Sequence, residues 1–270
     1  MAKHEVVRHN DLIFDVGAHV GQDTVYYLKK GFRVVAVEAD PELCSHLRRT
    51  FADALSHHRL AVVEAAISDR SGKGKFYKRG TSVFGTIVPD RVARDLRGRY
   101  EEIDVTFIAA ADLFREHGMP YFMKVDIEGA DRLCVEALRG FDQKPRYLSI
   151  EAEKDFDRFA SDAELLAELG YSSFQLVRQD TVPLMGVPTP SRAGLSVAHR
   201  FKLGSAGPFG RDLPDAWISL DALLQQYRPV AQRHETYGIE GWGSSWVGRQ
   251  ILRAVGLYPG WHDLHARLAR

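Results

Sequence analysis

Apolar and polar positions along the first 178 residues predict strands that alternate with helices. Short apolar runs typical of buried parallel strands lie at residues 12–16, 33–38, 60–67, 104–108, 121–126, 146–152 and 171–178. Helical spacing predicts helices at residues 21–30, 41–55, 111–117, 130–138 and 162–169. Because strands and helices alternate with short connections, we expect an α/β fold, a mostly parallel sheet with helices on both faces.

The remaining segments change this picture only locally. Residues 68–85 are rich in turn formers around a strand-like stretch at 75–78, which indicates a hairpin or surface excursion. Residues 180–210 read as a loop with one more strand at 199–203. Helices are expected at 220–227 and 246–255, followed by an aromatic-rich segment at 258–265. We expect a single domain over residues 1–270, with a core at about 12–215 and a helical C-terminal extension at 216–270.

Composition narrows the function classes. Lys plus Arg and Asp plus Glu number 36 each, and this balance argues against a dedicated nucleic-acid binder, which needs a basic excess. Two cysteines, Cys44 and Cys134, do not make a disulfide scaffold and favour a reducing compartment. A polar start and the absence of a long apolar run lead us to expect a cytoplasmic protein without a membrane partner.

Residues 13–21 (IFDVGAHVG) carry the densest functional signal. They predict a strand, a tight glycine turn and the start of a helix, where backbone amides approach a ligand closely. Glu38 lies at the end of the second strand, where a carboxylate accepts hydrogen bonds from ribose hydroxyls. The pattern therefore predicts a nucleotide-binding site.

The spacing of the glycines distinguishes between nucleotides. NAD-binding folds use G-x-G-x-x-G around a pyrophosphate, whereas here Gly17 and Gly21 are separated by three residues and Asp15 precedes them. An acid beside the turn repels a pyrophosphate and suits the sulfonium and ammonium groups of S-adenosylmethionine. An NAD-dependent oxidoreductase and a non-catalytic Rossmann-like interaction module stay as alternatives.

Four stretches resemble the FkbM-type family of class I S-adenosylmethionine-dependent methyltransferases. They are residues 15–24 (DVGAHVGQDT), 35–41 (VAVEADP), 65–72 (AAISDRSG) and 124–130 (KVDIEGA). The resemblance implies a Rossmann-like fold with a seven-stranded sheet whose last strand is antiparallel. It also implies methyl transfer from S-adenosylmethionine, usually to a hydroxyl oxygen of a saccharide or natural-product acceptor.

The resemblance also implies cofactor contacts. Asp15, Gly17, Ala18 and Gly21 would line the methionine end and Glu38 would hold the ribose, while Ala66, Ile67 and Ser68 would flank the adenine. His19 and Ala39 complete the expected cofactor-binding set, and Asp126 borders it. His19 departs from the family, which more often has asparagine there.

Three carboxylates are the candidate catalytic residues. Asp126 and Glu128 follow one predicted buried strand and Glu151 follows the next. An alcohol acceptor needs a group that removes its proton, and a charged acid at the end of an apolar strand is costly unless it is paired or used. Asp126 is otherwise a helix cap, and Glu151 otherwise pairs with Lys124 or Arg146. The three acids offer oxygen ligands to a divalent cation such as Mg²⁺, but their spacing defines no coordination geometry and we assign no metal site.

Aromatic residues of the C-terminal segment have two interpretations. Trp242, Trp246, Tyr258 and Trp261 could stack against an acceptor, or could dock the tail onto its own domain or a second subunit.

Overall fold

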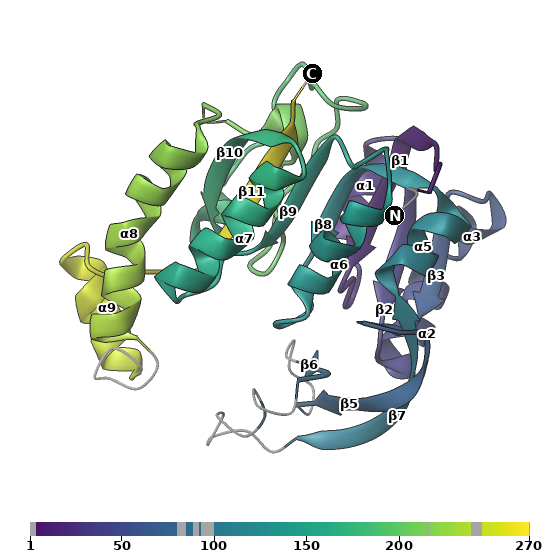
Figure 1. Cartoon of the computed structure of the whole chain (residues 1–270), viewed down its shortest axis with the longest axis horizontal. Helices are drawn as coiled ribbons and strands as arrows, with labels where there is room; N and C mark the ends of the chain where they lie inside the picture. Colours follow the sequence, from purple (N-terminus) through teal and green to yellow (C-terminus); the bar gives the residue numbers. More distant parts are fainter. Residues whose placement is uncertain are drawn as a thin grey trace.

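A seven-stranded sheet crosses the computed structural model, which describes residues 4–79, 85–88, 92, 100–214, 216–238 and 245–269. Its strands, in spatial order, are β10 (Tyr171–Arg178), β11 (His262–Leu268), β9 (Tyr147–Glu151), β8 (Met119–Val125), β1 (Arg8–Val16), β2 (Arg33–Glu38) and β3 (Leu60–Glu64). Neighbouring strands are parallel except at β11, which is antiparallel to both β10 and β9. The expected α/β fold with a seven-stranded, mostly parallel sheet is confirmed (Figure 1).

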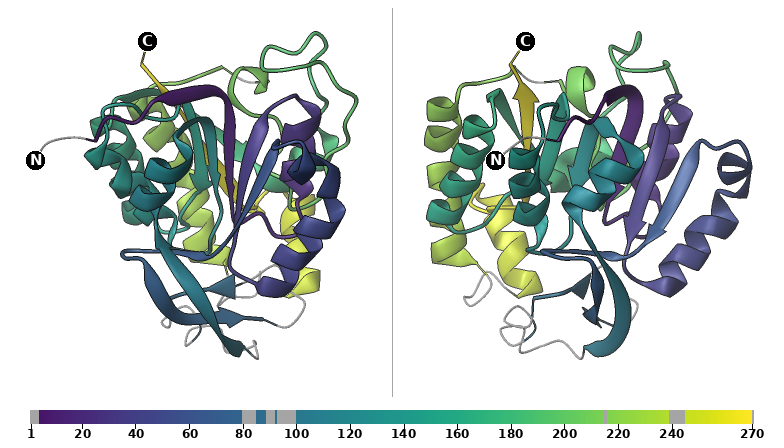
Figure 2. Two further views of the ribbon diagram at one scale, coloured as in Figure 1. Left: turned by 90° about the vertical axis from the view of Figure 1, so that its right-hand side faces the viewer. Right: turned by 45° about the vertical axis from the view of Figure 1, so that its right-hand side comes forward.

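Helices cover both faces of this sheet. One face packs against α5 (Ala110–His117), α6 (Asp131–Ala137), α7 (Phe156–Glu168) and α8 (Leu220–Tyr237). The other packs against α1 (Gln22–Lys29), α2 (Pro41–Thr50) and the segment from η2 (Gln179–Leu184) to η3 (Gly210–Asp212). The two views of Figure 2 show the sheet between these layers. Side chains on both faces of the central strands are therefore buried, as their continuous apolar runs require.

The long segment at 180–210 covers the sheet with aromatic side chains. Phe209 is fully buried and its ring lies 4.8 Å from that of Phe122 on β8. The strand expected at 199–203 is wrong, because Phe201 packs against Tyr26 of α1 with ring centroids 4.9 Å apart. The place beside β9 and β10 is taken by β11 instead.

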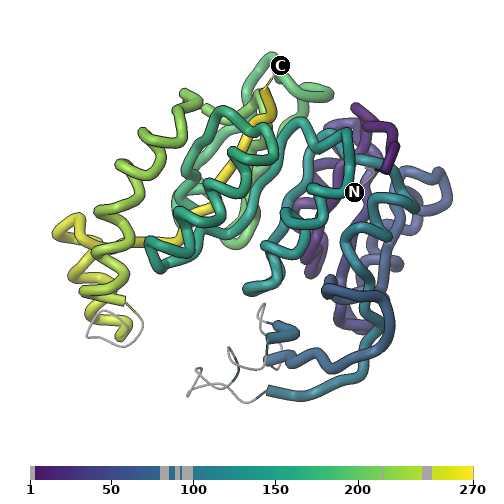
Figure 3. The backbone as a smooth tube through the Cα atoms, viewed as in Figure 1, coloured from purple at the N-terminus to yellow at the C-terminus, as the bar shows by residue number. Residues whose placement is uncertain are grey.

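The C-terminal extension is not wholly helical. It contains α8, α9 (Trp246–Ala254) and then β11, which inserts between β9 and β10 (Figure 3). The expectation of helices alone at 216–270 is wrong for β11, because its apolar residues Leu264 and Ala266 complete the core of the sheet. The antiparallel last strand expected from the family resemblance is thus supplied by the last residues of the chain.

A four-stranded sheet stands beside the carboxyl ends of the main strands. It contains β4 (Ala66–Ser68), β7 (Glu101–Ala109), β5 (Gly72–Lys78) and β6 (Gly85–Thr86). The expected hairpin at 68–85 is confirmed, since β5 pairs with β6. The expected single strand at 60–67 is wrong, because the chain leaves the main sheet at Ala65 and residues 66–68 pair with β7.

Two helices differ in extent from their patterns. The helix expected at 41–55 divides into α2 and α3 (Ala52–Ser56), and α7 begins earlier than expected because Asp155 caps it by accepting a hydrogen bond from the Arg158 amide. In the described part of the chain, no helix has the length and apolar character needed to cross a bilayer.

Candidate active site

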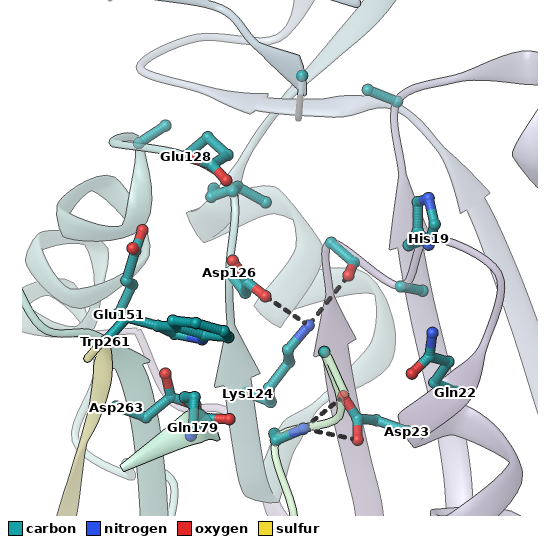
Figure 4. A pocket seen from close by; sticks show the side chains of 18 of the residues that line it. His19, Gln22, Asp23, Lys124, Asp126, Glu128, Glu151, Gln179, Trp261 and Asp263 are labelled. Atoms are coloured by element: carbon teal, nitrogen blue, oxygen red, sulfur yellow. Dashed lines mark hydrogen bonds and ion pairs between the residues drawn. The ribbon is translucent and has the colours of Figure 1, made fainter. Parts of the chain in front are cut away.

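A cavity of about 520 Å³ opens at the carboxyl ends of the parallel strands. The segments that follow β1, β2, β8 and β9 line it, together with the start of β11 and part of β5 (Figure 4). Open α/β sheets bind their ligands at this edge, where successive strands end and loops can approach a ligand. This cavity is the candidate active site.

The glycine turn after β1 lies flush against the end of β8. Gly17 has φ +81°, and a Cβ atom there would stand 2.0 Å from the carbonyl oxygen of Asp126. The amides of Gly17 and Ala18 donate to the Val37 carbonyl at 2.9 and 3.1 Å. Only glycine, which has no Cβ atom, fits this contact.

His19 continues the turn in a left-handed conformation, with φ 49°. Asparagine and histidine are among the few residues enriched in this conformation. The conformation therefore accounts for the histidine where the family more often has asparagine. The His19 ring lines the cavity, and its backbone amide donates to Glu38 Oε2 at 2.8 Å.

Glu38 at the end of β2 is held rigidly by backbone amides. In addition to the His19 bond, its Oε1 accepts from Ala39 at 2.8 Å and from Asp40 at 2.9 Å. A carboxylate has about four acceptor positions, so Oε2 keeps one open to a ligand. Burial raises the pKa of Glu38 although the three amides oppose this.

Lys124 on β8 joins the glycine turn to the acids of the cavity. Its Nζ donates to the Gly17 carbonyl at 3.0 Å and lies 3.6 Å from Asp15 Oδ1 and 3.5 Å from Asp126 Oδ2. Burial alone would lower the pKa of Lys124, but the surrounding carboxylates, Asp126 foremost, raise it above the usual value. Lys124 is therefore charged, and it neutralises part of this acidic site.

Asp23 at the start of α1 is a second buried acid of the cavity. Its two carboxylate oxygens accept from the Ala206 amide at 2.9 and 3.1 Å, which ties α1 to the 180–210 segment. Burial, reinforced by the charge of Asp15, raises the pKa of Asp23 to about 7.

The three candidate catalytic carboxylates lie close together, on the other side of the cavity from the glycine turn. One oxygen from each of Asp126, Glu128 and Glu151 lies within 4.8 Å of the others, so together they could hold a divalent cation. Burial, followed by the charges of Glu128 and Asp126, raises the pKa of Glu151 to about 8.

The alternatives considered for Asp126 and Glu151 do not apply. Ala130, not Asp126, is the N-cap of α6. Lys124 pairs with Asp15 and Asp126, while Arg146 donates to the Ala269 carbonyl. Neither of the two expected cations pairs with Glu151.

Most of the residues expected from the sequence line the cavity. They are Gly17, Ala18, His19, Glu38, Ala39, Ala66, Ile67, Asp126, Glu128 and Glu151. Asp15, Gly21 and Ser68 do not line it. Asp15 is buried beneath the turn, where Thr24 donates to it at 2.6 Å, and Gly21 supports the turn from behind with φ +80°.

The cavity is also lined by residues that were not expected as site residues, and five of them bear on its chemistry. They are Asp23, Lys124, Gln179, Trp261 and Asp263. Trp261 was considered only as part of an aromatic cluster, which the structure separates. Tyr258 also lines the cavity, Trp246 is 69% exposed on α9, and Trp242 lies outside the described residues. Gln179 and Asp263 come from the ends of β10 and β11, far from the motifs in sequence.

These features fit S-adenosylmethionine. The turn at Gly17 leaves room for a close ligand, Glu38 would offer an acceptor to its ribose, and Ala66 and Ile67 would form an apolar wall for its adenine. Asp23 and Asp126 line the same cavity, and their carboxyl groups suit its two positive groups, since opposite charges attract.

The similar solved structures include methyltransferases, all at low sequence identity. A precorrin-6y C5,15-methyltransferase from Geobacter metallireducens is 13% identical, covering 64% of this chain and 70% of its own with a TM-score of 0.34. An S-adenosylmethionine-dependent O-methyltransferase from Thermotoga maritima is 8% identical, covering 98% and 62% with a TM-score of 0.38. Similarity this low carries no conclusion about the substrate. No curated protein matches the chain.

The family is established by sequence. The profile of the methyltransferase FkbM domain matches residues 15–176, more than half of the chain. The matched region includes the glycine turn, Glu38 and the three candidate catalytic carboxylates. This assigns the nucleotide site to a methyl donor and not to NAD. The chain belongs to the FkbM family of methyltransferases, and its cofactor is S-adenosylmethionine.

Proposed function

We propose that this enzyme methylates a hydroxyl oxygen of a saccharide or natural-product acceptor. The observation that carries the proposal is Glu151, a carboxyl group with a pKa raised to about 8 in the same cavity as the methyl-donor site. A base is most effective when its pKa lies near the operating pH. An ordinary exposed carboxylate is too weak a base for this task.

An alcohol acceptor requires such a base. S-adenosylmethionine supplies an electrophilic methyl group, and the protein must align an acceptor oxygen with it. In our proposal Glu151 would accept the hydroxyl proton while the acceptor oxygen bonds to the methyl carbon, whose bond to sulfur breaks to leave S-adenosylhomocysteine. Asp126, paired with Lys124 at 3.5 Å, would orient the acceptor.

The turn and the acids would divide the cavity between two ligands. Gly17 and Ala18 would hold the methionine portion of the donor and Glu38 its ribose, on the side of β1 and β2. The acceptor would then lie toward β8 and β9, where Glu128 and Glu151 face the cavity. The proposal assigns to these strands the task of excluding water and placing the hydroxyl.

Transfer from labelled S-adenosylmethionine to a panel of hydroxylated acceptors tests the proposal. We expect an O-methyl product, identified by NMR, and a fall in kcat of about 10²- to 10⁴-fold in Glu151→Gln, the usual contribution of a general base. Glu164→Gln, an exposed change on α7, is the matched control. An unchanged kcat in Glu151→Gln, or a product methylated only on nitrogen or carbon, would sink the proposal.

The same assay measures any role of a divalent cation. Reactions with Mg²⁺ and with a chelator compare the base mechanism with one in which Asp126, Glu128 and Glu151 hold a metal. If the base mechanism is right, the chelator leaves kcat unchanged. Loss of activity with the chelator and its recovery with Mg²⁺ would assign the carboxylates to the metal instead.

A further inference from the structure

The wall of the cavity opposite the glycine turn comes from residues beyond the matched family domain. Asp263 belongs to the start of β11, Trp261 immediately precedes this strand, and Gln179 follows β10. The domain match ends at residue 176. These three residues, which we call the β11 wall, therefore lie outside the matched region.

Two acids stand directly opposite one another in this region. Asp263 on β11 pairs in register with Glu151 on β9, so their side chains leave the same face of the sheet. Cross-strand neighbours have Cβ atoms about 4.5–5.5 Å apart, and like charges there are destabilising. Such a pair is costly in the free protein.

Nothing in the described residues neutralises the pair. No hydrogen bond or ion pair of those residues reaches either carboxylate. Lys154 lines the cavity and lowers the pKa of Glu151, but it forms no ion pair with it. Lys124 acts on Asp263 at longer range while it is paired with Asp15 and Asp126. Burial is the main cause that raises the pKa of Asp263 well above its usual value.

An aromatic ring and a buried amide complete the wall. Figure 4 shows the Trp261 ring between Glu151 on one side and Asp263 and Gln179 on the other, with its far end toward Asp126. Gln179 is only 4% exposed, and its side chain makes one long contact of 3.5 Å with the Val177 carbonyl. Its backbone amide donates to the Trp261 carbonyl at 2.9 Å, which fixes the segment.

We propose that the β11 wall binds a protonated amine and that the acceptor is a vicinal amino alcohol, such as an amino sugar. An ammonium group is attracted both by a carboxylate and by the face of a tryptophan ring. In this arrangement the ammonium group pairs with Asp263, lies against the Trp261 ring and donates a hydrogen bond to the side-chain oxygen of Gln179. Because Glu151 is the direct cross-strand neighbour of Asp263, the hydroxyl that faces Glu151 belongs to the adjacent carbon.

This inference rests on the proposed O-methylation but is tested by binding alone. The protein loaded with S-adenosylhomocysteine is titrated with glucosamine, N-acetylglucosamine and glucose, and tryptophan fluorescence reports occupancy. We expect glucosamine to bind at least ten-fold more tightly than the other two sugars at neutral pH. Glucose replaces the ammonium with a neutral hydroxyl of similar size and so isolates the charge, whereas N-acetylglucosamine removes the charge and adds an acetyl group.

Variants locate the site. Asp263→Asn is expected to abolish the preference for glucosamine while the affinity for S-adenosylhomocysteine stays unchanged, and Asp221→Asn, an exposed change in the first turn of α8, preserves both. Trp261→Phe, which keeps an aromatic ring, is expected to weaken glucosamine binding several-fold. Thermal melting of each variant confirms that it is folded.

Three results would overturn the inference: equal affinity for the three sugars, no glucosamine binding by protein that binds S-adenosylhomocysteine, or an unchanged preference in Asp263→Asn. The inference would also be overturned if Mg²⁺ bound and displaced glucosamine, and if this Mg²⁺ binding were lost in Glu151→Gln. If glucosamine binds selectively but is methylated on nitrogen, the amine site stands and the O-methylation proposal fails.

Discussion

At the scale of single residues, Glu38 is oriented by three backbone N–H groups before any ligand arrives. Preorganisation of this kind lowers the entropy cost of binding. We expect Glu38→Gln to weaken binding of S-adenosylhomocysteine by about 10- to 100-fold, because a hydrogen bond to a charged group contributes about 1.5–3 kcal/mol. Calorimetry measures the loss, and Glu42→Gln, exposed on α2, is the control. Equal affinities would remove Glu38 from the ribose site.

Glu128 shows backbone strain at the candidate catalytic group. It has φ 51°, and Thr86 holds this conformation by donating to the Glu128 carbonyl at 3.0 Å. A non-glycine residue pays about 1–2 kcal/mol for the left-handed region. We therefore expect Glu128→Gly to raise the free energy of unfolding by about 1 kcal/mol and to lower kcat.

The comparison variant for this prediction is Glu128→Gln, which keeps the strained backbone and removes only the charge. Chemical denaturation should show the gain in Glu128→Gly and not in Glu128→Gln. A gain of the same size in both would mean that charge repulsion, not backbone strain, is the cost at this position.

At the scale of elements, short-range pattern predicts most of the sheet and fails at its last strand. The bounds of β2 and β10 agree with the expected ones, because each is a continuous run of strand-forming residues bounded by turn formers. In β11, Leu264, Ala266 and Leu268 alternate with polar residues, a period of two that would have indicated a strand. His265, one of those polar residues, is nonetheless only 2% exposed, so local polarity misleads.

The site residues likewise fall into two groups, those that a local motif predicts and those that it does not. Glu38 and the glycine turn are adjacent to their strands in sequence, so a local motif is enough to find them. Asp263 and Gln179 reach the cavity only because β11 inserts between β9 and β10, a pairing between residues about a hundred positions apart. Long-range strand pairing of this kind leaves no local signal.

Substitution of Leu264 measures how much the stability of the fold depends on the packing of β11. Its side chain is fully buried in the main core. We expect Leu264→Ala to lower the free energy of unfolding by about 2–5 kcal/mol, the usual cost of such a cavity. Val7→Ala, at a position 68% exposed, should change it by less than about 0.5 kcal/mol. Thermal denaturation compares the two, and similar small losses would show that β11 packs loosely on the sheet.

At the scale of the whole molecule, a fully buried ion pair fastens the 180–210 segment to α1. Lys30 Nζ lies 2.6 Å from Asp212 Oδ2, and Asp212 also accepts from the Ser191 hydroxyl at 2.8 Å and the Arg192 amide at 2.6 Å. We expect Asp212→Asn to cost about 3–5 kcal/mol, because it leaves Lys30 charged and unpaired. The double variant with Lys30→Met should cost less than Asp212→Asn alone.

The exposed pair of Arg33 and Asp11 is the matched comparison, and Asp11→Asn should cost no more than about 1 kcal/mol. Denaturation curves of the three variants test this prediction. If the double variant is as unstable as Asp212→Asn, the loss arises from the polar contacts of Asp212 rather than from the stranded charge of Lys30.

The pH dependence of the protein follows from the cavity as a whole, since burial, followed by the charges of Glu128 and Asp126, raises the pKa of Glu151 from 4.5 to about 8. Between these values the unfolded chain releases the proton while the folded protein keeps it, so the unfolded state binds fewer protons and stability falls as pH rises. Catalysis by ionised Glu151 has the opposite slope, and kcat/KM should rise through about pH 8. Glu151→Gln cannot ionise, so its stability relative to wild type should increase from pH 5 to pH 9, whereas Glu164→Gln should show no such trend. A pH-independent difference would mean that Glu151 keeps an ordinary pKa, and the group that removes the acceptor proton would then have to be sought among the other acids of the cavity.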